Sequence, residues 1–177
     1  MLPAFYPSEN PPIALHFTMN KALSASLSAL VGLFVFALPV KATPAADNPQ
    51  AKIAVGLVAQ VQALVKEQGL EKAVPLVNDP KGSFVQGDIY VFIFDLSNVC
   101  HAHGANSKMV GKDMSDLKDP NGVYIIRSFT QTVKESTRGW VDYAWTNPVT
   151  KKLGSKSSYV ERIVGTDYYV GAGIYNP

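Results

Sequence analysis

The segment Cys100-His101-Ala102-His103 carries residue types that bind metals or act as nucleophiles. Two histidines at i and i+2 of a regular strand share a face, so both imidazoles can approach one metal ion. A metal site needs a third ligand, and the remaining histidine, His16, lies in the N-terminal extension. Cys100 would point to the opposite face and pack as a small buried thiol. The pattern favours one histidine that lines a pocket or packs at its rim, with a metal site at His101 and His103 as the alternative.

Cysteine catalysis is the other chemistry that this segment suggests. A thiol nucleophile needs a neighbouring base and an oxyanion hole, and no motif in the sequence supplies the oxyanion hole. No haem attachment motif is present either. We therefore expect a protein that is not an enzyme and that uses no cofactor.

The last third of the chain, residues 139–175, has three aromatic-rich runs with alternating polarity, separated by turn signals. Alternation puts Tyr143 and Trp145 on one face of the first run, and Lys156 and Tyr159 follow on the second. Hydroxyl and indole groups donate hydrogen bonds, and lysine adds positive charge. This surface is suited to a small anionic molecule. Plain core packing is the alternative for the aromatic residues.

Two further residues are candidates for the same site. Arg127 lies at the edge of the apolar stripe of a helix expected over residues 119–135. Its guanidinium either reaches solvent along its aliphatic stem or turns into the sheet cavity, where two parallel donors suit a carboxylate. Tyr90, in the earlier apolar run 89–96, is a weaker candidate.

The elements that must position these residues follow from periodicity. A first helix is expected over 51–68, with Ile53, Leu57, Val61 and Leu64 buried, and Gly69 is a stop signal. A short helix, a strand with a hairpin partner, another helix and three strands follow, at 71–77, 89–96, 99–102, 119–135, 139–146, 155–164 and 167–175. Short connections between consecutive strands predict an antiparallel sheet, hence an α+β fold.

Five motifs in order then identify a resemblance: GDIYVFIFD (87–95), VGKDMSDLKDPNG (110–122), GWVDYAW (139–145), KSSYV (156–160) and GAGIY (171–175). Over roughly residues 50–175 the chain resembles the single Cache domains, closest to the type 2 subgroup, which are extracytoplasmic sensor modules of bacterial signalling proteins. The resemblance implies a PAS-like fold, with a long N-terminal helix on a central antiparallel sheet of about five strands.

The same resemblance implies that the domain binds a small organic acid of about two to four carbons and does no chemistry on it. It favours the inward orientation of Arg127 and a ligand-facing strand at His101 and His103. The resulting set of expected ligand-binding residues is Arg127, Tyr143, Trp145, Lys156, Tyr159, His101, His103 and Tyr90.

The N-terminus predicts export. Lys21 precedes an apolar run, 22–40, which is followed by small residues, so residues 19–42 are expected to be a signal peptide cleaved after Ala42. The alternative is an uncleaved membrane anchor. Residues 1–18 are expected to be a non-native or disordered extension, 43–49 a linker, and 50–177 a single Cache domain. The expected location is periplasmic or secreted, or the inner membrane if the anchor remains.

Length and charge exclude other classes. With 177 residues the chain has room for one domain, and a formal net charge of +2 without Lys/Arg clusters argues against nucleic-acid binding. A sensor without an output module implies a separate, membrane-bound signalling partner. A homodimer through the N-terminal helix is also expected from related sensors. The alternative in a different class is an anchored interaction domain that binds no ligand.

Overall fold

The computed structural model describes residues 48–176. The expected extension (1–18), the signal peptide or anchor (19–42) and residues 43–47 of the linker lie outside the described residues, so those predictions stay as they are. Within 48–176, no helix is both long enough and apolar enough to cross a membrane.

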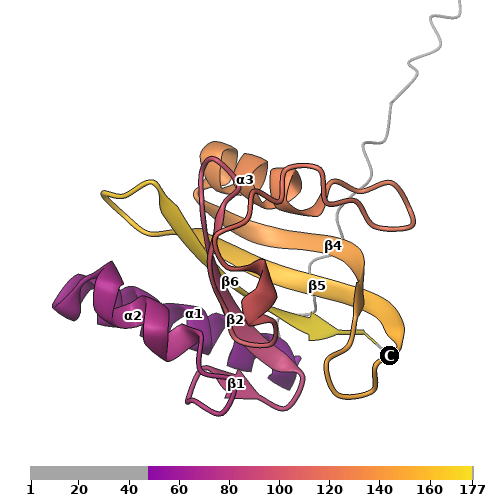
Figure 1. Cartoon of the computed structure of the whole chain (residues 1–177), viewed down its shortest axis with the longest axis horizontal. Helices are drawn as coiled ribbons and strands as arrows, with labels where there is room; N and C mark the ends of the chain where they lie inside the picture. The colour runs from indigo at the N-terminus through magenta and orange to yellow at the C-terminus, as the bar shows by residue number, and fades with distance from the viewer. Residues whose placement is uncertain (1–47, 177) are drawn as a thin grey trace, which may run out of the picture. The chain divides into compact units, whose positions relative to one another are not determined.

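Helices and strands follow one another in the predicted order, and the α+β class is confirmed (Figure 1). The elements are α1 (Pro49–Gln68), α2 (Leu70–Val77), β1 (Val85–Gln86), β2 (Ile89–Asp95), β3 (Cys100–His103), the 3-10 turn η1 (Ser107–Met109), α3 (Ile125–Ser136), β4 (Arg138–Thr146), β5 (Leu153–Arg162) and β6 (Tyr168–Tyr175). The short β1 and η1 were not predicted.

All strand pairs are antiparallel, and the main path through the sheet is β1-β2-β6-β5-β4. β3 pairs with β2 outside this path, as the hairpin partner that the sequence predicted. The last strand in sequence, β6, is therefore central, between β2 and β5. Helix α1 packs against one face of the sheet, and α3 with the segment before it covers the other (Figure 1).

Helix α1 begins at an Asn48 side chain that accepts hydrogen bonds from two first-turn amides, and ends at Gly69, whose φ is 84°. Its buried stripe is rotated from the expected one. Ile53 is 39% exposed, whereas Ala54 and Val58 are fully buried. Small alanine side chains let the helix approach the sheet closely, so the helix turns its alanine edge inward and Ile53 outward.

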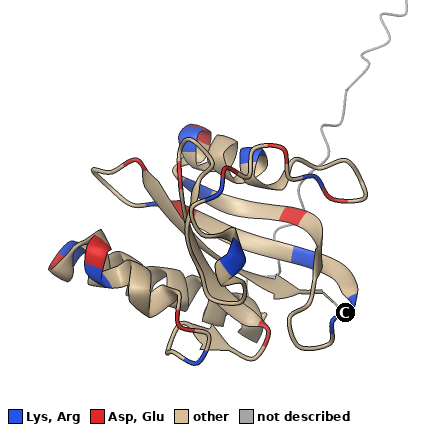
Figure 2. Cartoon of the chain, viewed as in Figure 1, with Lys and Arg blue, Asp and Glu red and all other residues tan. Residues whose placement is uncertain are grey.

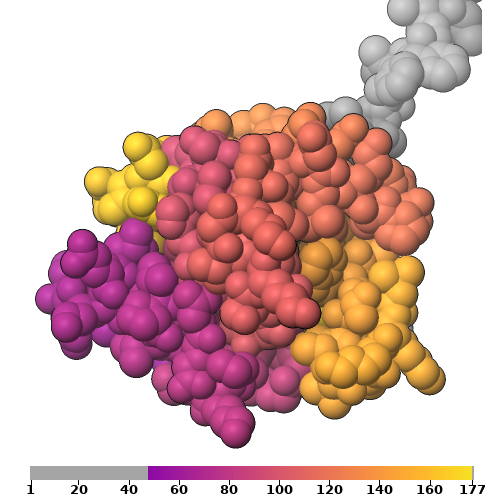
Figure 3. Space-filling model, in the orientation of Figure 1, coloured from indigo at the N-terminus to yellow at the C-terminus, as the bar shows by residue number. Residues whose placement is uncertain are grey.

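Helix α3 begins at Ile125, six residues after the expected start at Asp119. The Asp119 carboxylate accepts hydrogen bonds from the Asn121 and Val123 amides, as a cap would, but it also accepts one from the Ala144 amide of β4 at 2.9 Å. It therefore closes a turn and fixes that turn to the edge strand, which leaves the helix to start later. In the space-filling view, the chain between β3 and α3 covers the sheet on this side (Figure 3).

Candidate ligand-binding site

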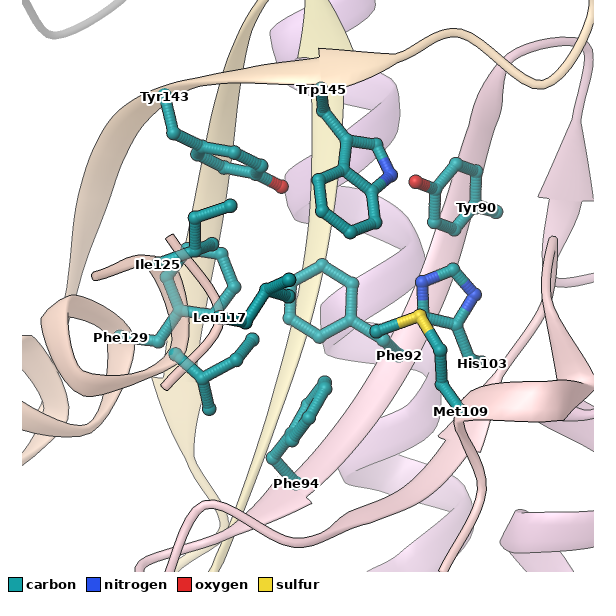
Figure 4. Close-up of a pocket in the computed structure, with 11 residues that line it drawn as sticks. Tyr90, Phe92, Phe94, His103, Met109, Leu117, Ile125, Phe129, Tyr143 and Trp145 are labelled. Carbon is teal, nitrogen blue, oxygen red and sulfur yellow. The ribbon is translucent and has the colours of Figure 1, made fainter. Parts of the chain in front are cut away.

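A small cavity lies between the sheet and α3, next to the segment that covers the sheet (Figure 4). The space open to the centre of a water-sized sphere is about 10 Å³, enough for about one water molecule. A bound carboxylic acid therefore requires lining side chains to move. The lining residues are mostly apolar and aromatic: Tyr90, Phe92, Phe94, His103, Met109, Leu117, Ile125, Ile126, Phe129, Tyr143 and Trp145.

Tyr90 is the centre of a hydrogen-bonded chain at one side of the cavity. The Trp145 indole donates to the Tyr90 hydroxyl, and Figure 4 shows the two side by side. Tyr90 donates to Tyr175, whose hydroxyl donates to the Thr146 carbonyl oxygen at 2.9 Å. Burial raises the pKa of Tyr90 well above its usual value. These phenols are neutral hydrogen-bonding groups, not anions that would repel a carboxylate.

Lys156 lies beside this chain. It sits on β5, paired with Tyr143 on β4 and Tyr175 on β6, and its side chain is completely buried. The Lys156 Nζ lies 3.7 Å from the centroid of the Tyr90 ring and 4.7 Å from that of Tyr175. Among residues 48–176, it is the buried side-chain nitrogen or oxygen that has no hydrogen-bond partner. The Lys156 amine, which can donate up to three hydrogen bonds when protonated, therefore has no acceptor among these residues.

The protein places little negative charge near the Lys156 amine to stabilise its protonated form. Most charged residues lie on helices and loops, and the strands are largely uncharged (Figure 2). Burial lowers the pKa of Lys156 well below its usual value, and the Asp88 carboxylate opposes this only partly. The Asp88 carboxylate in turn accepts a hydrogen bond from the Asn147 amide at 2.8 Å.

His103 adds a neutral imidazole to the cavity wall. Its ring centroid lies 4.8 Å from that of Tyr90, and its Nδ1 accepts a hydrogen bond from the Ala105 amide at 3.3 Å. Burial, and secondarily the nearby Lys156, lowers the pKa of His103 to about 3. The proton of the neutral ring is then on Nε2, which is a donor.

A β-bulge separates the two histidines that the sequence placed on one face. Phe92 pairs with His103, but Phe94 pairs with Cys100, so His101 is the extra residue of β3. Cys100 and His103 consequently belong to the cavity side. The prediction that His101 and His103 share a face is wrong, because it assumed a regular strand.

His101 instead lies against the hairpin. Its Nε2 is 2.9 Å from the Asp95 carboxylate, and its ring packs edge-on against Tyr168. Within the described part of the chain, no three His, Cys, Asp or Glu side chains are grouped so as to hold a metal ion.

Two other expected site residues lie elsewhere. Tyr159 follows Lys156 by three positions, so it faces the opposite side of β5. It packs beside Trp140 in the core under α1 and donates to the Glu161 carboxylate at 2.9 Å. Arg127 is on the surface with half of its side chain exposed, and donates to the Asp116 carboxylate at 2.5 Å. Of the two orientations considered for Arg127, the structure has the outward one.

The structure thus brings together five of the eight expected residues: Tyr90, His103, Tyr143, Trp145 and Lys156. His101, Arg127 and Tyr159 are outside this group. Sequence reasoning missed Tyr175, although its position in the motif GAGIY gave a signal, since alternation places it on the same face as the two glycines before it.

Gly173 explains why that motif needs glycine. A Cβ at Gly173 would overlap the Ser158 hydroxyl and lie 2.5 Å from the Lys156 Cε and 3.0 Å from the Ser157 carbonyl oxygen, too close for any side chain. The absent side chain leaves room for the lysine stem to cross β6 and reach Tyr90 on β2. Gly171 has the same role for Phe92, whose ring would lie 2.5 Å from an added Cβ.

Comparison with known proteins identifies the family of this chain. A family model described as Cache domain (dCache_2) matches residues 50–176. The methyl-accepting chemotaxis protein McpP of Pseudomonas putida is 28% identical over 88 residues, which are 50% of this chain and 16% of McpP. The sensor histidine kinase MctS of Rhizobium johnstonii is 31% identical over 88 residues, 50% of this chain and 19% of MctS. The matched region spans less than a fifth of each curated relative.

A solved structure described as the basis for carboxylic acid recognition by a Cache chemosensory domain is 27% identical, with a TM-score of 0.59. The match covers 72% of this chain and 89% of that chain. Another solved structure, described as the periplasmic sensor domain of a chemotaxis protein, is 26% identical with a TM-score of 0.59, and Cache sensor domains are ligand-binding modules without catalysis. The predicted resemblance is confirmed: this chain belongs to the Cache domain family.

Proposed function

We propose that this protein is an extracytoplasmic sensor that binds a short carboxylic acid, with Lys156 contacting the carboxylate. The observation that carries the proposal is the completely buried Lys156 Nζ, which has no hydrogen-bond partner and lies on the ring of Tyr90, one of the aromatic residues that line the cavity. A buried polar group left unsatisfied costs about 1–3 kcal/mol, so an acceptor supplied by a ligand is strongly favoured there.

The surrounding groups suit the same ligand. The His103 Nε2 is a neutral donor at the cavity, and carboxylate oxygens accept from such donors. The Trp145 indole and the Tyr90 hydroxyl become further donors when a ligand displaces their bonds to Tyr90 and Tyr175. Aromatic and aliphatic side chains fill the rest of the wall and favour a short hydrocarbon part. The likeness to a Cache domain described by its carboxylic acid recognition supports this choice over an amine.

A separate, membrane-bound signalling partner completes the proposal. The curated relatives are a chemotaxis protein and a sensor histidine kinase, in which the matched region is a minor part of the length. Self-association through α1 remains a prediction. Ile53 and Val55 on this helix are 39% and 37% exposed, and sedimentation analysis of the purified protein tests whether they form a dimer contact.

A thermal-shift screen of the purified protein against short carboxylates, amino acids and amines tests the function. Ligand at about 100 times its Kd adds about 2.7 kcal/mol of stability, which is a shift of several degrees. We expect a shift with one class of short carboxylate and its loss in Lys156→Met. If no compound changes the melting temperature, the ligand-binding function is refuted and the interaction-domain alternative takes its place.

A further inference from the structure

The protonation state of Lys156 depends on what occupies the cavity. The side chain is 0% exposed, and its Nζ contacts the faces of Tyr90 and Tyr175 but has no hydrogen-bond acceptor in the described part of the chain. Aromatic faces attract a cation, but they do not replace the hydration that a buried ammonium loses. Without an anion in the cavity, the uncharged amine is therefore favoured.

The titratable groups that face Lys156 do not change this balance. They are Tyr143 on β4, Tyr175 on β6, Tyr90 on β2, His103 on β3 and Asp88 in the turn before β2. Burial raises the pKa of each of the three tyrosines and lowers that of His103, so all four are neutral near pH 7. Asp88 is the single carboxylate of the set, and Asn147 already binds it.

An incoming carboxylate reverses the preference. A negative charge within about 4–6 Å favours the charged form of a lysine, and a charge-assisted hydrogen bond adds to this. The amine then forms one new N–H bond with a proton from the solvent, and the ligand remains a carboxylate. The filled cavity holds one ammonium and one carboxylate, and its net charge is the same as when the cavity was empty.

We propose that the site binds a short carboxylic acid as its anion together with one proton, which Lys156 Nζ takes from the solvent. This rests on the proposed function, because it concerns the same site. Binding that takes up a proton strengthens as pH falls. When one full proton is taken up for each ligand bound, the Kd rises tenfold for each unit of pH increase. The sensor then responds to acidity and to the anion jointly.

Titration calorimetry of acetate and propionate measures this proton directly. Both anions are fully ionised near neutral pH, so any proton taken up goes to the protein. The observed heat is measured in two buffers of different ionisation enthalpy, at about pH 7 and about pH 9, which lie below the usual pKa of lysine. We expect the heat to depend on the buffer, with a slope of about one proton per ligand bound, and the Kd to be larger at the higher pH.

The results separate the two proposals. Binding with no buffer dependence at either pH overturns proton uptake and leaves the proposed function in place. No binding of either acid, together with a flat thermal-shift screen, overturns both. NMR of the His103 imidazole with and without acetate at about pH 7 locates the proton: a ring that stays neutral on binding assigns it to Lys156, and a ring that becomes charged assigns it to His103 and overturns the proposal.

Discussion

Lys156 on β5 reaches across β6 and places its Nζ 3.7 Å from the ring centroid of Tyr90 on β2. The contact joins two strands that are not neighbours in the sheet, and the glycine at position 173 leaves the space for it. The lysine amine is thereby held on the ring of Tyr90, which lines the polar side of the cavity together with Trp145.

Replacing Lys156 with Met should make the unliganded protein more stable and insensitive to carboxylates. Methionine has a similar shape and leaves no buried amine unsatisfied, so we expect a gain of about 1–3 kcal/mol. Thermal and urea denaturation, with and without acetate, measure both effects. Lys152→Met, at an exposed site, is the matched control and should keep the ligand response. A destabilised Lys156→Met that still responds to acetate would contradict the assignment.

Gly173→Ala should weaken both the fold and the ligand affinity. The added Cβ would overlap the Ser158 hydroxyl and lie 2.5 Å from the Lys156 Cε, so both side chains must move, the lysine stem away from Tyr90. Overpacking of this kind costs about 1–3 kcal/mol. Gly154→Ala is the control, because a Cβ there meets only Tyr175, at an ordinary 3.6 Å. Equal effects of the two substitutions on acetate binding would show that the Gly173 contact is unimportant.

Stability should fall as the solution is acidified between pH 6.5 and about 3, in part because of His103. Its usual pKa of 6.5 is lowered to about 3 in the folded protein, so in this window the unfolded chain binds one more proton than the native state. One such proton gives a slope of about 1.4 kcal/mol per pH unit. Urea denaturation at several pH values should show a shallower slope in His103→Gln. The same substitution at His101 is the comparison, and should keep the His103 contribution.

Arg127→Ala should leave carboxylate affinity within about twofold and cost less than about 1 kcal/mol, because an exposed ion pair contributes little. The Asp116 partner is 91% exposed, and the guanidinium lies over the ring of Tyr124, outside the cavity. Acetate titration of this variant beside Lys156→Met distinguishes the two cations. Loss of binding in Arg127→Ala alone would return Arg127 to the site.

Cys100 should resist thiol reagents until the protein unfolds. Burial raises the pKa of the thiol to about 12, so very little thiolate is present near pH 8. We expect Ellman's reagent to label the native protein slowly and the urea-unfolded protein at once. Rapid labelling without denaturant would mean that the core next to Phe94 opens readily.

The order of elements and the strands β2 to β6 were predictable because apolar runs, alternation and turn residues are local signals. It was less predictable which face of the sheet each residue would occupy. Tyr159 could have been placed correctly, since it is an odd number of positions from Lys156 on one strand. His101 could not, because the bulge depends on how β3 pairs with β2.

The start of α3 and the side chain of Arg127 were not predictable for a related reason. Asp119 resembles a helix cap in sequence, and only its bond to the β4 amide of Ala144 makes it a turn anchor. Arg127 had two possible orientations on the edge of an apolar stripe. The nearby Asp116 and Tyr124 attract it outward, and their proximity is a property of the folded segment between β3 and α3.

The two faces of β6 have a mechanical consequence. Gly171, Gly173 and Tyr175 face the ligand side, while Ala172 and Ile174 belong to the core that includes α1. A displacement of β6 on its cavity side therefore also shifts α1, because the helix packs on the opposite face of the same strand. Helix α1 has 20 residues, a length of about 30 Å, so a slight tilt at its contact with β6 becomes a larger displacement at its ends.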